Sequence, residues 1–239
     1  MKKAIPARTA RRLAGGLAAL LILGLVLFVD CFTGDPVSRA FANRQMLAWA
    51  NAQWPGNDFY IAEQFGGACF TYDVRLQSSI SADTWFNVGS VLGLWGYRNS
   101  YESQVDQGYN TMHRMEQALE SAAKACLEEH AFSEKYAPKV YASLGLPGAD
   151  GRRSLPALEL DAPYDQALAR QASLSLQIAT NGPPDPEQAR RAATDAKAAL
   201  EAGGLSFAGY EVTLHDGTVD YQQSLSTLVE AAFSAQELG

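Results

Sequence analysis

The sequence predicts an α+β protein that begins with a transmembrane helix. Three features lead to this prediction. They are an uncharged apolar run from Leu13 to Val29, a helix-then-strand pattern over residues 36–92, and a strand-and-helix pattern over residues 173–238. In chain order we expect the N-terminal transmembrane helix, a helix plus a three-strand antiparallel meander, a helical middle, and a small β-α-β-α unit.

The same features divide the chain into five parts. We expect a cytoplasmic basic tail (1–12), a transmembrane helix (13–32), an α+β unit with a long helix (33–147), a linker (148–163) and the β-α-β-α unit (164–239). The linker is placed where Gly and Pro accumulate, because these residues interrupt regular structure.

The apolar run sets the predicted location. As a helix rising ~1.5 Å per residue it spans roughly 26 Å, close to the ~30 Å of a bilayer core. No acidic residue occurs before Asp30, and five basic residues precede the run: Lys2, Lys3, Arg8, Arg11 and Arg12. The positive-inside rule then predicts a single-pass protein of the cell membrane with a cytoplasmic N-terminus and the bulk of the chain extracytoplasmic.

Three alternatives to a retained anchor stay open. A signal peptide could be cleaved after Ala40-Phe41-Ala42, although this site lies far beyond Val29 for a typical signal sequence. A lipoprotein signal could end at Cys31, but Asp30 is a poor residue before a lipidated cysteine. A buried helix of a soluble protein is the third alternative, which the flanking charges disfavour.

The composition excludes some partners. All 26 acidic residues follow Val29, so this part of the chain is more acidic than the overall net charge of −7. This argues against nucleic acid and against an anionic lipid surface as partners. Three cysteines do not form a disulfide scaffold. Cys69 and Cys126 can pair outside the cytoplasm, or each can fill a small buried position.

The first unit is expected to begin with a helix. Asp35 and Pro36 form a helix start, and Trp54-Pro55-Gly56 a helix stop. The predicted buried stripe consists of Val37, Ala40, Phe41, Leu47 and Ala48. Three strands follow, near 58–65, 70–77 and 84–92, and the second alternates apolar and polar residues.

Several segments of this unit resemble YfjL-like proteins, a family of membrane-anchored proteins of Gram-positive bacteria. The segments are Phe32 to Ala40, Ser81 to Phe86, Tyr101-Glu102 and Tyr109 to Thr111. The resemblance implies a short N-terminal tail, one membrane helix and an α+β domain outside the cell. The family has no assigned activity, so the resemblance implies no catalytic residue.

The spacing of apolar residues predicts the remaining helices and strands. Helical periodicity predicts one helix over 105–126 and a second from Phe132 to Leu144. Alternation predicts strands through 173–178 and 210–214, with a helix between them that starts at Asp185 and ends at Gly203. A last helix is expected from Tyr221 to Leu238.

The sequence contains no recognisable catalytic or metal motif. His113, His130 and His215 lack metal-ligand spacing, and Cys69 lacks a recognisable partner base. We therefore expect no enzyme activity, no cofactor and no metal. Trp85, Trp95 and Tyr97 are the candidate binding residues, because exposed aromatic side chains mark surfaces that bind a protein, peptide or glycan.

These observations predict an extracytoplasmic binding, sensing or envelope accessory module without enzymatic activity, and a protein or peptide partner outside the cell. Two alternatives stay open. The first is an envelope hydrolase whose site leaves no motif, which requires titratable groups to converge in a pocket. The second is an assembly subunit that uses its own membrane helix, for which Gly15, Gly16 and Gly24 provide close-packing positions.

Overall fold

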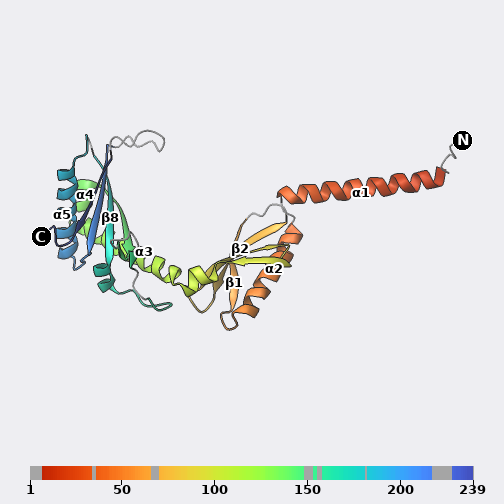
Figure 1. Ribbon diagram of the computed structural model, residues 1–239, viewed down its shortest axis with the longest axis horizontal. Coiled ribbons are helices and arrows are strands. Elements are labelled where there is room, and N and C mark those ends of the chain that lie inside the picture. The colour runs from red at the N-terminus through yellow and green to blue at the C-terminus, as the bar shows by residue number, and fades with distance from the viewer. Residues whose placement is uncertain are drawn as a thin grey trace. The chain divides into compact units, whose positions relative to one another are not determined.

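The computed structural model describes residues 7–33, 36–65, 70–147, 153–154, 158–180, 182–216 and 228–238. The chain is a mixed α+β protein and divides into two compact units, Met1–Gln107 and Gly108–Gly239 (Figure 1). The helices of the first unit are α1 (Ala7–Thr33), α2 (Pro36–Gln53) and the π-helix η1 (Glu102–Asp106). Its strands are β1 (Phe59–Phe65), β2 (Thr71–Ser78), β3 (Trp85–Val91) and β4 (Trp95–Asn99).

The second unit contains α3 (Tyr109–Glu129), α4 (Phe132–Tyr136), the 3-10 helix η2 (Gln166–Gln171) and α5 (Pro186–Ala202). Its strands are β5 (Lys139–Leu144), β6 (Leu146–Pro147), β7 (Arg153–Ser154), β8 (Ala172–Ala179), β9 (Gly209–His215) and β10 (Leu228–Ser234).

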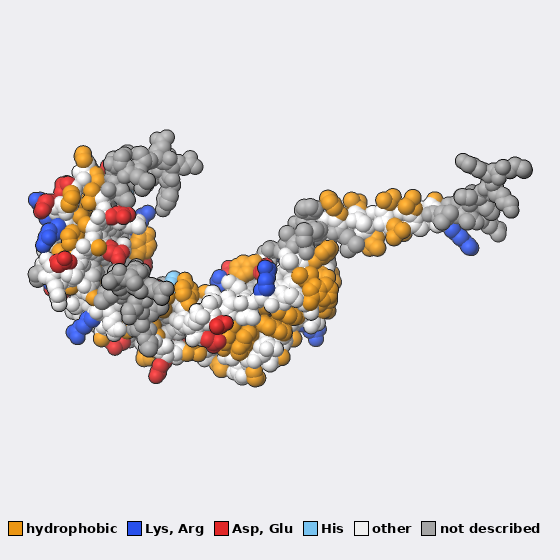
Figure 2. Space-filling model, viewed as in Figure 1, with side chains coloured by type: hydrophobic (Ala, Val, Ile, Leu, Met, Phe, Trp, Pro, Cys, Tyr) orange, Lys and Arg blue, Asp and Glu red, His pale blue; other side chains and the backbone are white. Residues whose placement is uncertain are grey.

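Helix α1 contains the apolar run and carries exposed hydrophobic side chains along its length (Figure 2). Leu17, Leu21 and Phe28 are each exposed by more than half. Within the described part of the chain, no helix combines the length and the hydropathy that mark a membrane span.

The first unit packs α2 against an antiparallel sheet in the order β1-β2-β3-β4. The predicted alternation of β2 is confirmed. Tyr72, Val74 and Leu76 are buried, whereas Thr71 before them and Arg75 between Val74 and Leu76 are half-buried. Phe86 and Val88 of β3 are buried with them, so one face of the sheet forms the core beneath α2.

Two expectations for this unit were wrong. The buried side of α2 consists of Ala42, Asn43, Met46 and Ala50. Four residues of the predicted stripe are exposed because the opposite side of the helix faces the sheet: Val37, Ala40, Phe41 and Ala48. Leu47 is partly buried and packs against the core, as predicted. The meander has four strands rather than three, since β4 pairs with β3. Gly93 and Gly96, both with positive φ, obscured this hairpin in the sequence.

The second unit has a four-stranded sheet in the order β10-β9-β8-β5. Strands β8 and β9 are parallel and joined through α5, whereas the other two pairs are antiparallel. Val140, Leu176 and Val212 occupy neighbouring register positions and share one core with residues of α3 and α5. Both long helices therefore cover the same face of this sheet.

The second unit also corrects the sequence analysis. Helix α4 ends at Tyr136, and the rest of the predicted Phe132–Leu144 helix is strand β5. The end of the chain forms β10 rather than a helix over Tyr221–Leu238, of which residues 221–227 lie outside the described residues. The order β8-α5-β9-β10 replaces the expected β-α-β-α. The predicted linker 148–163 lies inside the second unit, because β5 before it pairs with β8 after it.

Candidate functional site

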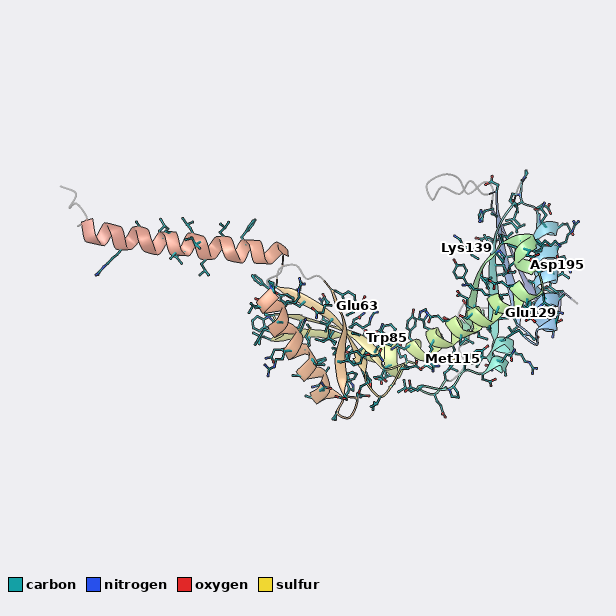
Figure 3. All side chains as sticks on the ribbon, turned by 180° about the vertical axis from the view of Figure 1, so that it is seen from behind. Glu63, Trp85, Met115, Glu129, Lys139 and Asp195 are labelled. Atoms are coloured by element: carbon teal, nitrogen blue, oxygen red, sulfur yellow. The ribbon has the colours of Figure 1, made fainter. Side chains whose placement is uncertain are left out.

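The face of the first-unit sheet that points away from α2 carries polar and aromatic side chains. We call it the open face, and its central residues are Glu63, Arg75, Trp85 and Asn87. Cross-strand register places Arg75 beside Glu63 on one side and Asn87 on the other. Trp85 is two residues from Asn87 and pairs with Gln77, so it lies on the same face. Glu63 and Trp85 are labelled in Figure 3.

Arg75 organises the open face. Its Nη1 lies 2.9 Å from Oε2 of Glu63, and its guanidinium carbon lies 4.9 Å from the ring centroid of Trp85. Phe65 contributes a second ring at 5.6 Å. An ion pair and two cation–π contacts therefore fix one guanidinium group, which holds the aromatic rings in place at the surface.

Two polar atoms at the centre of this face have no hydrogen-bond partner among the described residues. They are Nε of Arg75, a donor, and Oδ1 of Asn87, an acceptor, and both are buried. Because Arg75 and Asn87 are direct cross-strand partners, these atoms belong to neighbouring positions. An unsatisfied buried polar atom costs about 1–3 kcal/mol. A group with one donor and one acceptor, such as an amide or a hydroxyl, matches the pair.

A second charged pair borders the open face. Asp73 Oδ1 lies 3.9 Å from Nη2 of Arg98. Gly89 is opposite Asp73 in the register, and a Cβ atom at this glycine would lie 2.1 Å from the same carboxylate oxygen. Because Gly89 has no side chain, the Asp73 carboxylate can occupy this position.

The structure separates the three predicted binding residues. Trp85 lies on the open face, as described above. Tyr97 packs on the helix side, where its ring stacks on Trp49 with centroids 4.7 Å apart and its hydroxyl donates to the carbonyl of Gly93. Burial raises the pKa of Tyr97. Trp95, at the start of β4, is 58% exposed. The three candidate binding residues therefore do not share one surface.

The structure describes one of the two cysteines of the predicted disulfide. Cys69 lies outside the described residues. Cys126 is a free, buried thiol whose Sγ donates to the carbonyl of Ala199 at 3.3 Å. Burial raises the pKa of this thiol. Cys126 thus fills a small buried position, and its pairing with Cys69 stays a prediction.

In the second unit, a charged cluster joins two helices. Lys135 Nζ lies 2.6 Å from Oδ2 of Asp195, and the Tyr136 hydroxyl donates to the same oxygen at 2.7 Å. The hydrogen bond from Lys135 lowers the pKa of Asp195, and the same bond raises the pKa of Lys135. Each of these residues is engaged by the others, so the cluster links α4 to α5.

Within the described residues, no group of His, Cys, Asp and Glu side chains is arranged to hold a metal ion. His130 Nδ1 lies 2.9 Å from the carbonyl oxygen of Cys126, and His113 Nε2 lies 3.1 Å from the amide nitrogen of Gln117. Both histidine side chains therefore contact residues of helix α3, in which His113 lies and which His130 follows.

The sequence analysis missed Arg75 and Asn87 as candidate residues. A signal for them was present, because the alternation of β2 already placed Arg75 with Asp73 and Gln77 on the polar face. The pairing of Arg75 with Asn87 needed the register of β2 and β3, which the sequence does not specify.

Comparisons of the chain with protein-family models, with curated proteins and with solved structures found no match. The resemblance to YfjL-like proteins therefore stays a prediction that depends on the quoted segments.

Proposed function

We propose that the protein is a single-pass membrane protein with a cytoplasmic N-terminus, whose two units act outside the cytoplasm as a non-enzymatic binding or sensing module of the cell envelope. The observation that carries the binding role is the open face. A buried donor on Arg75 and a buried acceptor on Asn87 occupy neighbouring positions beside the ring of Trp85, and neither has a hydrogen-bond partner in the part of the chain that the structure describes.

The proposed location depends on the first part of the chain. Basic residues precede the apolar run of α1. The large apolar side chains that the structure describes in this helix are exposed. Exposed leucines along one helix lose their contact with water if that helix crosses a bilayer, which favours insertion. The resemblance to membrane-anchored YfjL-like proteins supports the same topology.

The proposed partner is a protein or peptide. A peptide backbone offers an N–H donor and a carbonyl acceptor at each residue, which matches the unpaired atoms on Arg75 and Asn87. Trp85, held by Arg75, offers an aromatic surface of the kind enriched at protein interfaces. The ionisable side chains at the centre of the face are already engaged in an ion pair, which suits recognition better than proton transfer.

Location is tested by fractionation of cells that make the full chain. Protease is added to intact protoplasts, and the mass of the membrane-bound protein is measured. We expect a membrane-bound protein of full mass that is digested from outside. A soluble product that starts near Asn43 would instead show cleavage after Ala40-Phe41-Ala42, and the anchor would be excluded.

Binding is tested in the same cells by photocrosslinking. Tyr60 is half exposed and lies on the open face in the row of Gln77 and Trp85, so it is replaced by a photoreactive phenylalanine analogue. We expect a crosslinked protein or peptide whose yield falls several-fold in the Asn87→Ala variant. The matched control is Gln64→Ala, an exposed amide on β1 that pairs with the core residue Val74. No adduct, or equal loss in both variants, would contradict the proposal.

A further inference from the structure

Four large hydrophobic side chains gather at one end of the first unit. Val37 (75% exposed) and Phe41 (45%) come from the first turns of α2, Leu94 (49%) comes from the turn after β3, and Trp95 (58%) is the first residue of β4. We call these four residues the end patch. Figure 2 shows that hydrophobic side chains are concentrated on the α2 side of this unit.

Close backbone contact brings the two segments together. A Cβ atom at Gly93 would lie 2.6 Å from the Cα atom of Ala42 and 2.8 Å from its carbonyl oxygen. Gly93 precedes Leu94 and Ala42 follows Phe41, so the two segments that carry the exposed side chains meet at this contact.

The chain connects the end patch directly to the proposed anchor. Helix α1 ends at Thr33 and α2 begins at Pro36. Three Cα–Cα steps cover at most about 11 Å. If α1 crosses a bilayer, the first turn of α2 must lie close to the membrane surface.

The charge near the end patch also fits a lipid headgroup layer. Residues 36–53 and 92–98 contain Arg39, Arg44 and Arg98 and no acidic residue, in a chain of net charge −7. The side chain of Arg98 is 74% exposed, and Arg44 is exposed as well. Guanidinium groups form strong hydrogen bonds with phosphate. The acidity of the rest of the chain is absent from these two segments, and the nearest ion-pair partner of their arginines is Asp73, 3.9 Å from Arg98.

We infer that the end patch lies in the outer headgroup layer of the bilayer, with Trp95 and Leu94 inserted beside Val37 and Phe41. This inference depends on the proposed membrane anchor and adds a second, surface contact to it. Tryptophan favours this layer because its ring is apolar and its indole N–H finds polar partners there. The contact would hold the first unit against the membrane instead of leaving it free on its tether.

The test uses the full chain in vesicles of phosphatidylcholine and phosphatidylglycerol whose acyl chains are brominated. Bromine quenches tryptophan fluorescence only at short range. We expect quenching of the wild type to exceed that of Trp95→Phe, and Val37→Trp in the Trp95→Phe background to restore it.

The matched control is Ile80→Trp in the Trp95→Phe background. Ile80 is 70% exposed and lies in the turn after β2, where Ser78 and Ser79 hydrogen-bond to Asn57 and Asp58 just beyond the end of α2. The 18 residues of α2 span roughly 27 Å, so this position is far from the end patch. We expect no added quenching in this variant.

The outcomes separate the two proposals. A chain that does not float with the vesicles would contradict the anchor. A chain that floats, but in which Trp95 is quenched no more than the Ile80→Trp control, would overturn the surface contact and leave the anchor intact. Quenching at position 37 alone follows from the anchor, because α2 begins three residues after α1 ends, so the surface contact depends on quenching of Trp95.

Discussion

Gly93 is a residue of the first unit at which we expect a side chain to be poorly tolerated. Its φ is +69°, and the position of a Cβ atom is already occupied by the backbone of Ala42. We expect Gly93→Ala to destabilise the first unit by on the order of 3 kcal/mol, because steric overlap adds to the cost of positive φ. Thermal unfolding followed by tryptophan fluorescence measures this loss.

Gly96 provides the control for Gly93. It lies in the same hairpin with a φ of +65°, but the nearest atom to an added Cβ is Cγ2 of Val91 at 3.9 Å. Gly96→Ala should therefore cost only about 1–2 kcal/mol, the cost of the left-handed backbone alone. Equal losses in the two variants would show that the contact with Ala42 is unimportant.

Cys126 should be chemically inert in the folded protein. Its thiol is buried and its pKa is raised, and both effects reduce the amount of accessible thiolate. We expect iodoacetamide at pH 8 to leave the Cys126 peptide unmodified in the native protein and to modify it in denaturant, as judged by mass spectrometry. A peptide linked to Cys69 would instead reveal the disulfide.

At the scale of elements, the contact of Lys135 with Asp195 makes the α4–α5 link dependent on pH. The pKa of Asp195 is lowered in the folded state, so its charge stabilises the fold above the ordinary value of 3.8. This contribution disappears as the pH falls through the lowered pKa. The pKa of Lys135 is raised above 10.5, so its contribution is complete below that value and is lost as the pH rises through the raised pKa.

The Asp195→Asn variant tests this window. It keeps an acceptor for Tyr136 but removes the charge, so we expect a small loss of thermal stability at pH 7 and a smaller difference from the wild type near pH 3. The loss is small because solvent screens the pair: the side chain of Lys135 is 63% exposed and that of Asp195 is 42% exposed. Glu201→Gln, which removes an ion pair within α5 itself, is the control for a general effect of charge. A difference that persists unchanged at pH 3 would contradict the assignment.

At the scale of the whole molecule, each unit has its own buried core. All four tryptophans, at positions 49, 54, 85 and 95, belong to the first unit, so their fluorescence reports on that unit alone. Leu176 is fully buried in the second unit. We expect Leu176→Ala to lower the stability of the second unit by about 2–5 kcal/mol. Circular dichroism should show an earlier transition, while the tryptophan transition stays in place.

The complementary variant is Val74→Ala, because Val74 is fully buried in the core of the first unit. It should move the tryptophan transition. If Leu176→Ala moved the tryptophan transition equally, the two cores would not unfold separately.

The sequence by itself determined the elements whose signals are local. The alternation of β2 and β8 predicts strands because successive side chains point to opposite faces. The start of α5 was also readable, since Oδ1 of Asp185 accepts from the backbone N–H of Gln188 as an N-cap does. The same kind of evidence supports the apolar run of α1, for which the role of anchor stays a prediction.

The tertiary structure decided what depends on long-range contacts. Short apolar segments such as Lys139–Leu144 and Leu228–Ser234 fit a helix or a strand, and only pairing with β8 and β9 makes them strands. The buried side of α2 was decided by which side chains fit the sheet, so Val37 and Phe41 lie outside. Arg75 and Asn87 meet through strand register, because pairing between β2 and β3 is set by the packed core and not by either strand alone.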